Sequence, residues 1–283
     1  MNINCVFAAV LCVVAMFMLS AQVSADIKGW YAPSTLKVLR DAKAQKTSSW
    51  QLNAAKNEVE ACQLVLLSNK PVNDVQVSVS DLQNKKSNGI LKASLFKVEY
   101  VEITDKKIPY PDPLPPLMKP FDLAPNQAQP IWVSLRVPKD ADKGLYEGQV
   151  IVDANGNKQS YPLSINVWGF TLPDTPSSDT AFGISSEHIA RTHGTKSSSE
   201  LAGLYARYYE MLLDHKVSAY GIPVDLSTKD ADKYLNDPRM TSYCIPFPSD
   251  DAEVKKVAEK LRAGGWLKKG YYYPIDEPFT AEP

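Results

Sequence analysis

The chain has 283 residues, a formal net charge of -1 at pH 7, and 22% charged residues. This length is enough for one large or two ordinary domains. The nearly balanced charge and the lack of a basic cluster argue against nucleic acid as the main partner.

The first 25 residues have the pattern of a secretory signal peptide. An apolar run covers residues 7–19, and the small residues Val23-Ser24-Ala25 follow it, so we expect cleavage after Ala25. No Lys or Arg precedes the run, and the alternative is an uncleaved anchor. Since a spanning helix needs roughly 20 apolar residues, cleavage is favoured. We therefore expect a secreted protein, extracellular or periplasmic, with no membrane association after cleavage.

Residues 26–173 are predicted to form a β-sandwich. Short apolar or alternating runs are separated by turn residues, as all-β domains require, and no helical periodicity interrupts them. The expected strands cover residues 60–67, 75–80, 96–103, 131–137, 146–152 and 161–168. The last two are joined by Asn155-Gly156-Asn157, and Asn-Gly between alternating strands is typical of a hairpin.

A proline-rich segment, residues 109–117, interrupts this pattern with five prolines. Because proline fixes φ, the backbone there is held extended. We favour a stiff crossing between strands over the alternative, a rigid strap against the next domain or the rim of a site.

Two cysteines, Cys62 and Cys244, remain after signal cleavage. A secreted protein can join such a pair in a disulfide. They fall in different predicted domains, however, and we expect two unpaired, buried thiols. No metal-ligand spacing and no phosphate-binding glycine motif appears, so we expect no metal and no cofactor.

Residues 174–283 are predicted to alternate strand and helix, which implies a parallel sheet. Expected strands cover residues 180–184, 217–223, 240–246 and 270–275, and expected helices begin at Glu200 and Asp250. Leu201, Leu204, Tyr205, Tyr208, Met211 and Leu212 are the predicted apolar stripe of the first helix. Since a (β/α)8 TIM-type barrel takes roughly 250 residues, the pattern predicts a barrel truncated after about its fourth strand. We expect a fragment of a longer protein.

Asp276 and Glu277 are the candidate catalytic residues. They follow the aromatic run Tyr271-Tyr272-Tyr273 where a strand opens into a loop, which is where barrel enzymes carry their chemistry. Ordinary glycosidase carboxylates stand about 5 Å or more apart. An adjacent pair therefore suits a substrate-assisted variant, in which the 2-acetamido oxygen of the sugar attacks the anomeric carbon. The alternative is a solvated acidic loop before Pro278.

Weaker candidates for substrate binding are His188, Arg191 and Tyr273. His188, Arg191 and His193 follow the first predicted strand of the second half, at the same mouth of the barrel. A lone histidine is more often a surface or hydrogen-bonded residue. Tyr273 and Trp266 are candidates for stacking on sugar rings, but aromatic residues are also common in cores. Asp225 follows the second strand and Phe247 the third.

An ordered set of motifs resembles glycoside hydrolase family 123. It runs through Asn57-Glu58-Val59-Glu60-Ala61-Cys62-Gln63, Tyr110-Pro111-Asp112-Pro113-Leu114, Trp132 to Pro138, Gly144-Leu145-Tyr146-Glu147-Gly148, Trp168 to Pro173, and Asp276-Glu277-Pro278. The resemblance implies an N-terminal β-sandwich on a (β/α)8 barrel and retaining, substrate-assisted cleavage of β-linked N-acetylgalactosamine. It implies that Asp276 stabilises the 2-acetamido group and that Glu277 is the general acid/base.

The sequence therefore predicts a secreted glycoside hydrolase, or the front half of one, whose partner is a glycan or glycoconjugate. The alternative is a non-catalytic carbohydrate-binding or cell-surface module in which the sandwich carries the function.

Overall fold

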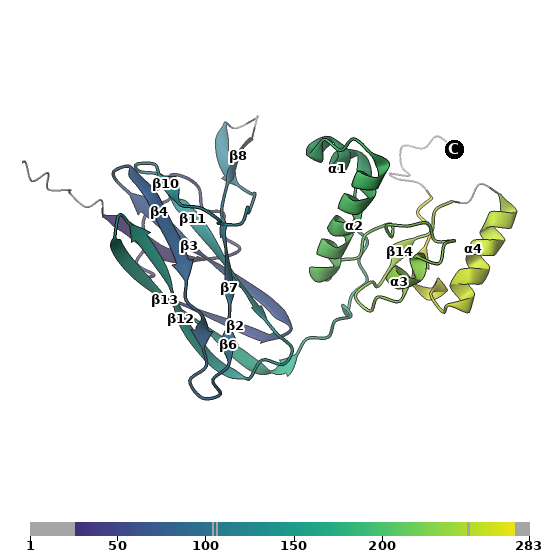
Figure 1. The fold of residues 1–283 in the computed structure, drawn as a ribbon, viewed down its shortest axis with the longest axis horizontal. Helices are drawn as coiled ribbons and strands as arrows, with labels where there is room; N and C mark the ends of the chain where they lie inside the picture. Colours follow the sequence, from purple (N-terminus) through teal and green to yellow (C-terminus); the bar gives the residue numbers. More distant parts are fainter. Residues whose placement is uncertain (1–25, 104, 106, 248–249, 275–283) are drawn as a thin grey trace, which may run out of the picture. The chain divides into compact units, whose positions relative to one another are not determined.

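The computed structural model describes residues 26–103, 105, 107–247 and 250–274. The chain divides into two compact units, Met1–Phe170 and Thr171–Pro283. The first is a β-sandwich and the second is a smaller unit of helices and short strands (Figure 1). Each unit has its own apolar core. The predicted signal peptide lies outside the described residues.

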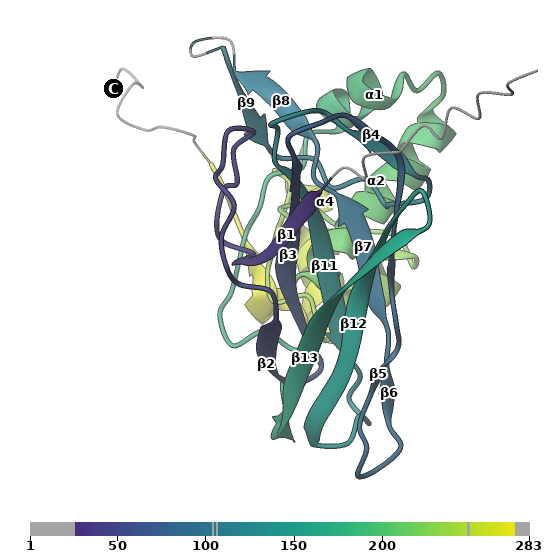
Figure 2. The same ribbon diagram turned by 90° about the vertical axis from the view of Figure 1, so that its left-hand side faces the viewer.

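The sandwich consists of two antiparallel sheets that face each other across one core (Figure 2). One sheet has the order β1-β3-β11-β7, and the other has the order β10-β4-β12-β13-β2, in which β5 also pairs with β12, and β6 pairs with β5. The strands are β1 (Ile27–Pro33), β2 (Trp50–Lys56), β3 (Glu58–Ser68), β4 (Val72–Val79), β5 (Leu82–Gln83), β6 (Ile90–Leu91), β7 (Ala93–Lys97), β10 (Phe121–Leu123), β11 (Gln129–Val137), β12 (Gly144–Ala154) and β13 (Asn157–Thr171).

The central strand β3 is buried on both faces, which explains its nearly continuous apolar sequence. Cys62, Leu64 and Leu66 point into the main core between the sheets. Val65 points the other way, into a small second core covered by the segment after β1. Gln63 also lies on this outer side, and its amide donates to two backbone carbonyls at 2.9 Å each. The polar residue in the run is therefore buried and still hydrogen-bonded, as burial requires.

Tyr31 links the two sheets. Its hydroxyl, on β1, donates to the backbone carbonyl of Tyr161 on β13 at 3.0 Å. The Tyr161 ring packs against Gly29, where an added Cβ would lie only 2.3 Å from the ring. The glycine therefore allows the close approach of strand and ring that this contact needs.

The predicted hairpin at Asn155-Gly156 is confirmed. β12 and β13 pair in continuous register from Gly144↔Val167 to Ala154↔Asn157. Asn155 and Gly156 have φ values of 55° and 85°, so both central residues adopt the left-handed conformation that a type I′ turn demands.

The expected strand over residues 96–103 is wrong in its continuity. The structure has β7 up to Lys97, and then β8 (Tyr100–Ile103), which pairs with β9 (Ile108–Pro111) in a hairpin projecting from one end of the sandwich (Figure 1 and Figure 2). The proline-rich segment causes the change, because it runs on along the free edge of β7. The carbonyls of Pro113 and Pro115 accept from Glu99 and Lys97 at 2.9 and 3.0 Å. Prolines suit such an edge since they cannot donate to a further strand.

The second unit contains four helices and a short 3-10 turn among its described residues. They are α1 (Ser186–His193), α2 (Ser198–Asp214), α3 (Ala231–Leu235), α4 (Asp251–Ala263) and the turn Leu267–Lys269, and its strands are β14 (Tyr243–Cys244) and β15 (Gly270–Tyr271). None of the helices among the described residues is both long and apolar enough to cross a membrane.

The two predicted helices are confirmed, and their ends have clear local causes. The Ser197 hydroxyl caps α2 by accepting from the Glu200 backbone N–H at 3.2 Å, and Asp250 caps α4 in the same way at 2.8 Å. After α4, Gly265 has a φ of 73°, which ends the helix.

The predicted stripe of α2 is displaced by part of a turn. The residues of α2 that are fully buried are Tyr209 and Leu213, whereas Met211 is 47% exposed. The core of the unit approaches α2 from the Tyr209 side, and the Tyr208–Met211 flank lines a pocket instead.

Arg239 ties α2 to the loop after α3. Its guanidinium pairs with Asp237 at 2.6 Å and with Glu210 and Asp214 of α2 at 2.8 Å each. Burial by itself raises the pKa of Asp237, but hydrogen bonds from Arg239 outweigh this effect and lower the pKa overall. The cluster fixes the end of α2 relative to the segment that leads into β14.

Replacing Tyr31 with Phe tests the link between the sheets. We expect the substitution to lower the free energy of unfolding by about 1–2 kcal/mol, because the buried hydrogen bond to Tyr161 is lost. Chemical denaturation followed by tryptophan fluorescence measures this, since four of the five tryptophans lie in the first unit. Tyr110→Phe, in the half-exposed part of the β8–β9 hairpin, is the matched control, and we expect it to change stability by less than about 0.5 kcal/mol.

The difference in unfolding free energy between wild type and Tyr31→Phe should depend on pH. Burial raises the pKa of Tyr31 above its usual value, so the neutral phenol is favoured in the folded state. Its contribution is complete below the unfolded pKa of about 10 and is lost as pH rises beyond it. The stability gap between wild type and Tyr31→Phe should therefore narrow above pH of about 10. A gap that widens there would contradict this assignment.

Candidate functional site at the strand ends of the second unit

Four segments of the second unit lie side by side in parallel. The backbone N–H of Phe182 donates to Ser218 at 2.9 Å, and that of Tyr220 donates back to Phe182 at 2.8 Å. The next contacts join Cys244 to Tyr220 and Ile245 to Tyr271, and β14 and β15 pair in parallel register. Because the segments follow sequence order and point the same way, their carboxyl ends meet at one edge. Open α/β sheets bind ligands at this edge.

One face of these strands is packed against the helices. Ala219, Tyr243 and Ile245 belong to the core of the unit together with buried residues of α2 and α4. Trp266 also packs against this core, and its indole N–H donates to Asn236 at 3.0 Å. Trp266 was a candidate for stacking on sugar rings in the sequence, but in the structure it packs against the core of the unit.

The opposite face carries Tyr220, Cys244, Tyr271 and Tyr273, which we call the tyrosine face. Cys244 and Tyr271 are partners in the parallel register. Burial raises the pKa of Tyr271, and the proximity of Cys244 and Tyr220 adds to the effect. The rings of Tyr220 and Tyr273 lie 5.7 Å apart with an angle of 34° between their planes. The residues therefore cluster although they come from three different strands.

The tyrosine face contains a buried polar group that no described residue satisfies. The Tyr271 hydroxyl is inaccessible to solvent and has no hydrogen-bond partner among the described residues. Such groups are rare in folded proteins.

A second aromatic pair, Phe247 and Tyr272, lies at the same strand ends. Its ring centroids are 5.4 Å apart. Tyr272 follows Tyr271 directly, and successive residues of an extended strand point to opposite sides. Phe247 is 62% exposed and Tyr272 is 48% exposed.

Phe247 also borders a cavity of about 230 Å³ between the second and third strands and α4. Most of its lining is apolar, and the two carboxylates that reach it are Asp225 and Glu253. Asp225 accepts from the Ser227 backbone N–H at 2.7 Å, and this hydrogen bond lowers the pKa of Asp225. Its carboxylate is therefore part of a turn and is ionised at neutral pH, so it does not suit the role of a general acid.

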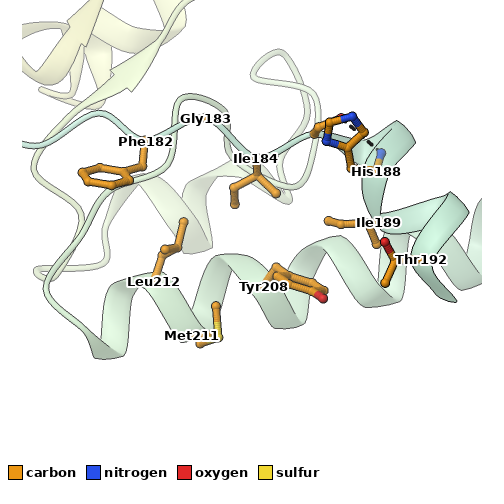
Figure 3. Close-up of a pocket in the computed structure, with 10 residues that line it drawn as sticks. Phe182, Gly183, Ile184, His188, Ile189, Thr192, Tyr208, Met211 and Leu212 are labelled. Atoms are coloured by element: carbon orange, nitrogen blue, oxygen red, sulfur yellow. Dashed lines mark hydrogen bonds between the residues drawn. The ribbon is translucent and has the colours of Figure 1, made fainter. Parts of the chain in front are cut away.

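A larger cavity of about 360 Å³ lies beside the first strand (Figure 3). Figure 3 shows it as a trough between the segment with Phe182 and Ile184 and helix α2, with α1 at one end. His188 lines it from the first turn of α1, where its backbone N–H donates to the Ser185 hydroxyl at 3.1 Å.

The predicted substrate-binding residues fall into two places. Tyr273 lies on the tyrosine face, against Tyr220. His188 and Arg191 both lie on α1, a helix that was not predicted, and Arg191 is exposed and does not line the cavity. The neighbouring His193 ring nitrogen is 3.0 Å from the Tyr208 hydroxyl. Among the described residues, Tyr273 has its ring contact with Tyr220, whereas His188 and Arg191 lie apart from this pair on α1.

The predicted catalytic pair, Asp276 and Glu277, lies outside the described residues, which end at Pro274. Among the residues that are described, no group of three or more His, Cys, Asp or Glu side chains is placed to hold a metal ion.

Residues 36–154 match the family model of the glycoside hydrolase 123 N-terminal domain. The β-sandwich is therefore similar to the N-terminal domain of glycoside hydrolase family 123. This chain is similar to the solved structure of a family 123 glycoside hydrolase from Clostridium perfringens, which was determined to study glycolipid glycan hydrolysis. The TM-score is 0.57 and the sequence identity is 18%. At this identity the similarity shows the fold alone. It covers 85% of this chain and 46% of the other, so the chain spans about half the length of that family 123 structure.

Other solved structures resemble the chain only weakly. The GspB Siglec domain has a TM-score of 0.26 and 11% identity, and covers 56% of this chain and 64% of its own. AvmM, which catalyses macrocyclization in alchivemycin A biosynthesis, has a TM-score of 0.28 and 10% identity, and covers 54% and 91%. Neither carries an argument about this protein. No curated protein sequence matches the chain significantly.

Sequence reasoning missed Tyr220 as a site residue. The signal was present, since Tyr220 lies in the predicted strand over residues 217–223, but its partner Tyr273 is 53 residues away. Only the order of the parallel strands brings the two rings together.

The two thiols predict a reactivity difference. Both cysteines are free in the structure, Cys62 fully buried and Cys244 half-buried on the tyrosine face. Burial raises the pKa of Cys62 to about 12, and only the thiolate is nucleophilic. In protein lacking residues 1–25, a thiol reagent should label Cys244 in the native state and Cys62 only after unfolding. Cys244→Ser should abolish native labelling.

Peptide mapping by mass spectrometry identifies the labelled residue. Native labelling at Cys62, or a Cys62–Cys244 disulfide that leaves the unfolded, unreduced protein unlabelled, would contradict the assignment.

Proposed function

We propose that this chain is the front half of a secreted glycoside hydrolase that cleaves β-linked 2-acetamido sugars, such as N-acetylgalactosamine, with retention. The observation that carries the proposal is the family 123 match over residues 36–154, followed by parallel strands that lead to Asp276-Glu277. The substrate is therefore a glycan or glycoconjugate. The apolar run and Val23-Ser24-Ala25 support export to an extracellular or periplasmic location.

The second unit is, in this proposal, the first half of a (β/α)8 barrel. Its strand segments follow one another in sequence order and in parallel, with α2 between the first and second, α3 between the second and third, and α4 between the third and fourth. This is the order in which a barrel is built. The coverage of about half of the family 123 structure supports a protein that continues beyond this half.

The proposed reaction assigns one carboxyl group to the sugar amide and one to the leaving group. The acetamido oxygen forms a bond to the anomeric carbon while the glycosidic C–O bond breaks and Glu277 donates its proton to the departing oxygen. The Asp276 carboxylate accepts a hydrogen bond from the amide N–H of the sugar and stabilises the positive charge that develops on the cyclic intermediate. The Glu277 carboxylate then removes a proton from water. The water oxygen attacks the anomeric carbon and breaks its bond to the acetamido oxygen, which opens the cyclic intermediate and leaves the sugar ring intact.

Apolar surroundings would keep Glu277 protonated long enough to act as an acid. The tyrosines that precede it, Tyr271 and Tyr273, share alternate positions with Glu277 along the chain. They are suited to supply these surroundings.

A second candidate function, a non-catalytic carbohydrate-binding sandwich, is favoured by one observation. Trp168 and Phe170 of β13 stack at 5.6 Å and 19°, and they are 45% and 53% exposed. Exposed aromatic groups of this kind often mark binding surfaces.

Substitution of the carboxyl pair tests the proposed reaction. In the full-length gene product, Glu277→Gln should reduce the rate of hydrolysis of a natural 2-acetamido-β-galactoside, whose leaving group is poor, by at least about 100-fold. The reason is that the proton donor is lost. Asp276→Asn should also lower kcat strongly, since the amide loses the carboxylate that orients it. Steady-state kinetics on aryl and alkyl glycosides measures both effects.

Asp225→Asn serves as the control, since Asp225 is held in a turn, and we expect nearly unchanged rates. Near-normal turnover by Glu277→Gln would show that the acid assignment is wrong. Sugar binding that persists without hydrolysis and disappears in Trp168→Ala would support the sandwich module instead.

A further inference from the structure

The pair formed by Tyr220 and Tyr273 has an unusual position. The two residues come from the second and fourth strand segments, so the third strand lies between them. Neighbouring strands are about 4.8 Å apart, and the second and fourth are therefore separated by roughly twice that distance. The ring centroids nevertheless lie only 5.7 Å apart.

Two small residues, Cys244 and Gly183, lie near the pair. The third strand has Cys244, rather than a bulky residue, at the position that pairs with Tyr271, and Cys244 and Tyr220 both lie near Tyr271. On the other flank of Tyr220 the first strand presents Gly183, where a Cβ would lie 3.7 Å from the ring.

Both rings remain accessible. Tyr220 is 37% exposed and Tyr273 is 46% exposed, although their ring centroids are 5.7 Å apart with an angle of 34° between the planes. Together they present a broad aromatic surface at the carboxyl edge of the strands. A pyranose ring has an apolar C–H face and a hydroxyl-bearing rim, and a paired aromatic surface with phenol groups complements both.

We propose that Tyr220 is a further substrate-binding residue, and that Tyr220 and Tyr273 together form the platform on which a 2-acetamido sugar ring stacks. This rests on the proposed function, because it assumes that the substrate is a glycan. Tyr273 precedes Asp276 by three residues, so the platform belongs to the strand that leads directly to the proposed catalytic pair. The occupant is a neutral pyranose ring, for which no charged partner is required.

Tyr272 provides a matched control within the same strand. It has nearly the same exposure as Tyr273, but its ring contacts Phe247 rather than Tyr220. If general aromatic exposure at this edge were enough to bind sugar, Tyr272 and Tyr220 would behave alike. If the pair of Tyr220 and Tyr273 forms the platform, only its members should affect binding.

The test measures the dissociation constant of N-acetylgalactosamine for the purified chain by NMR titration. Tyr220→Leu should weaken binding about tenfold, the size expected for one lost stacking contact. Tyr220→Phe keeps the ring and should stay within about twofold of wild type, as should Tyr272→Leu. Unchanged binding in Tyr220→Leu, or equal losses in Tyr220→Leu and Tyr272→Leu, would overturn the proposal, and so would a wild-type chain that binds no sugar.

A second measurement does not depend on the folding of a variant. In wild-type protein with labelled tyrosines, added sugar should shift the ring resonances of Tyr220 and Tyr273 and leave those of Tyr272 in place. Shifts confined to Tyr272, or no shifts at all, would contradict the platform even if Tyr220→Leu does not fold.

Hydrolysis separates this proposal from the proposed function. If the full-length gene product hydrolyses the glycoside and Tyr220→Leu leaves its KM unchanged, the platform is wrong and the enzyme assignment stands. If sugar binds in a Tyr220-dependent way and no hydrolysis occurs, the enzyme assignment fails and the platform stands.

Discussion

The parallel hydrogen bonds between four short strand segments are the constraint on which the candidate site depends. Phe182, Tyr220, Cys244 and Tyr271 occupy neighbouring positions because backbone groups join each segment to the next. Once this order is set, the strand alternation decides everything else: one face packs on the helices, and the other collects tyrosines. The helices stabilise this strand order, since Arg239 forms ion pairs that link α2 to the segment leading into the third strand.

The sandwich shows how the first unit is stabilised independently. Its central strand β3 is buried on both faces, and Tyr31 and Gly29 bring β1 against β13. The proline-rich segment lies along the edge of β7, and Pro113, Pro115 and Pro116 have no backbone N–H to donate to a further strand. This arrangement protects an edge strand from pairing with another chain.

Features set by neighbouring residues could be predicted from the sequence. The hairpin at Asn155-Gly156 follows from two residues that tolerate positive φ, and α4 follows from the acidic residues at its start and the glycines at its end. By contrast, α1 has only eight residues and few apolar ones, although Ser185 caps it and Gly194 ends it. His188 and Arg191 therefore appeared in the sequence as loop residues at a barrel mouth.

Features set by distant residues could not be predicted. The break between β7 and β8 depends on carbonyls of the proline-rich segment, and the buried side of α2 depends on which residues pack against it. Met211, expected in the core, is exposed for this reason. The pairing of Tyr220 with Tyr273 is the clearest case, because no local pattern specifies that two strands flanking a third will bring their rings together.

The central claim is that the parallel strand order places Tyr220 and Tyr273 on one face, at the edge from which the chain runs to Asp276-Glu277. Nuclear Overhauser effects between aromatic ring protons, in a chain with labelled tyrosine and phenylalanine, test it most directly. The structure predicts cross-peaks between the rings of Tyr220 and Tyr273, and between those of Phe247 and Tyr272. Cross-peaks that join Tyr220 to Tyr272 instead, or a Tyr220 ring without contacts to Tyr273, would contradict the account.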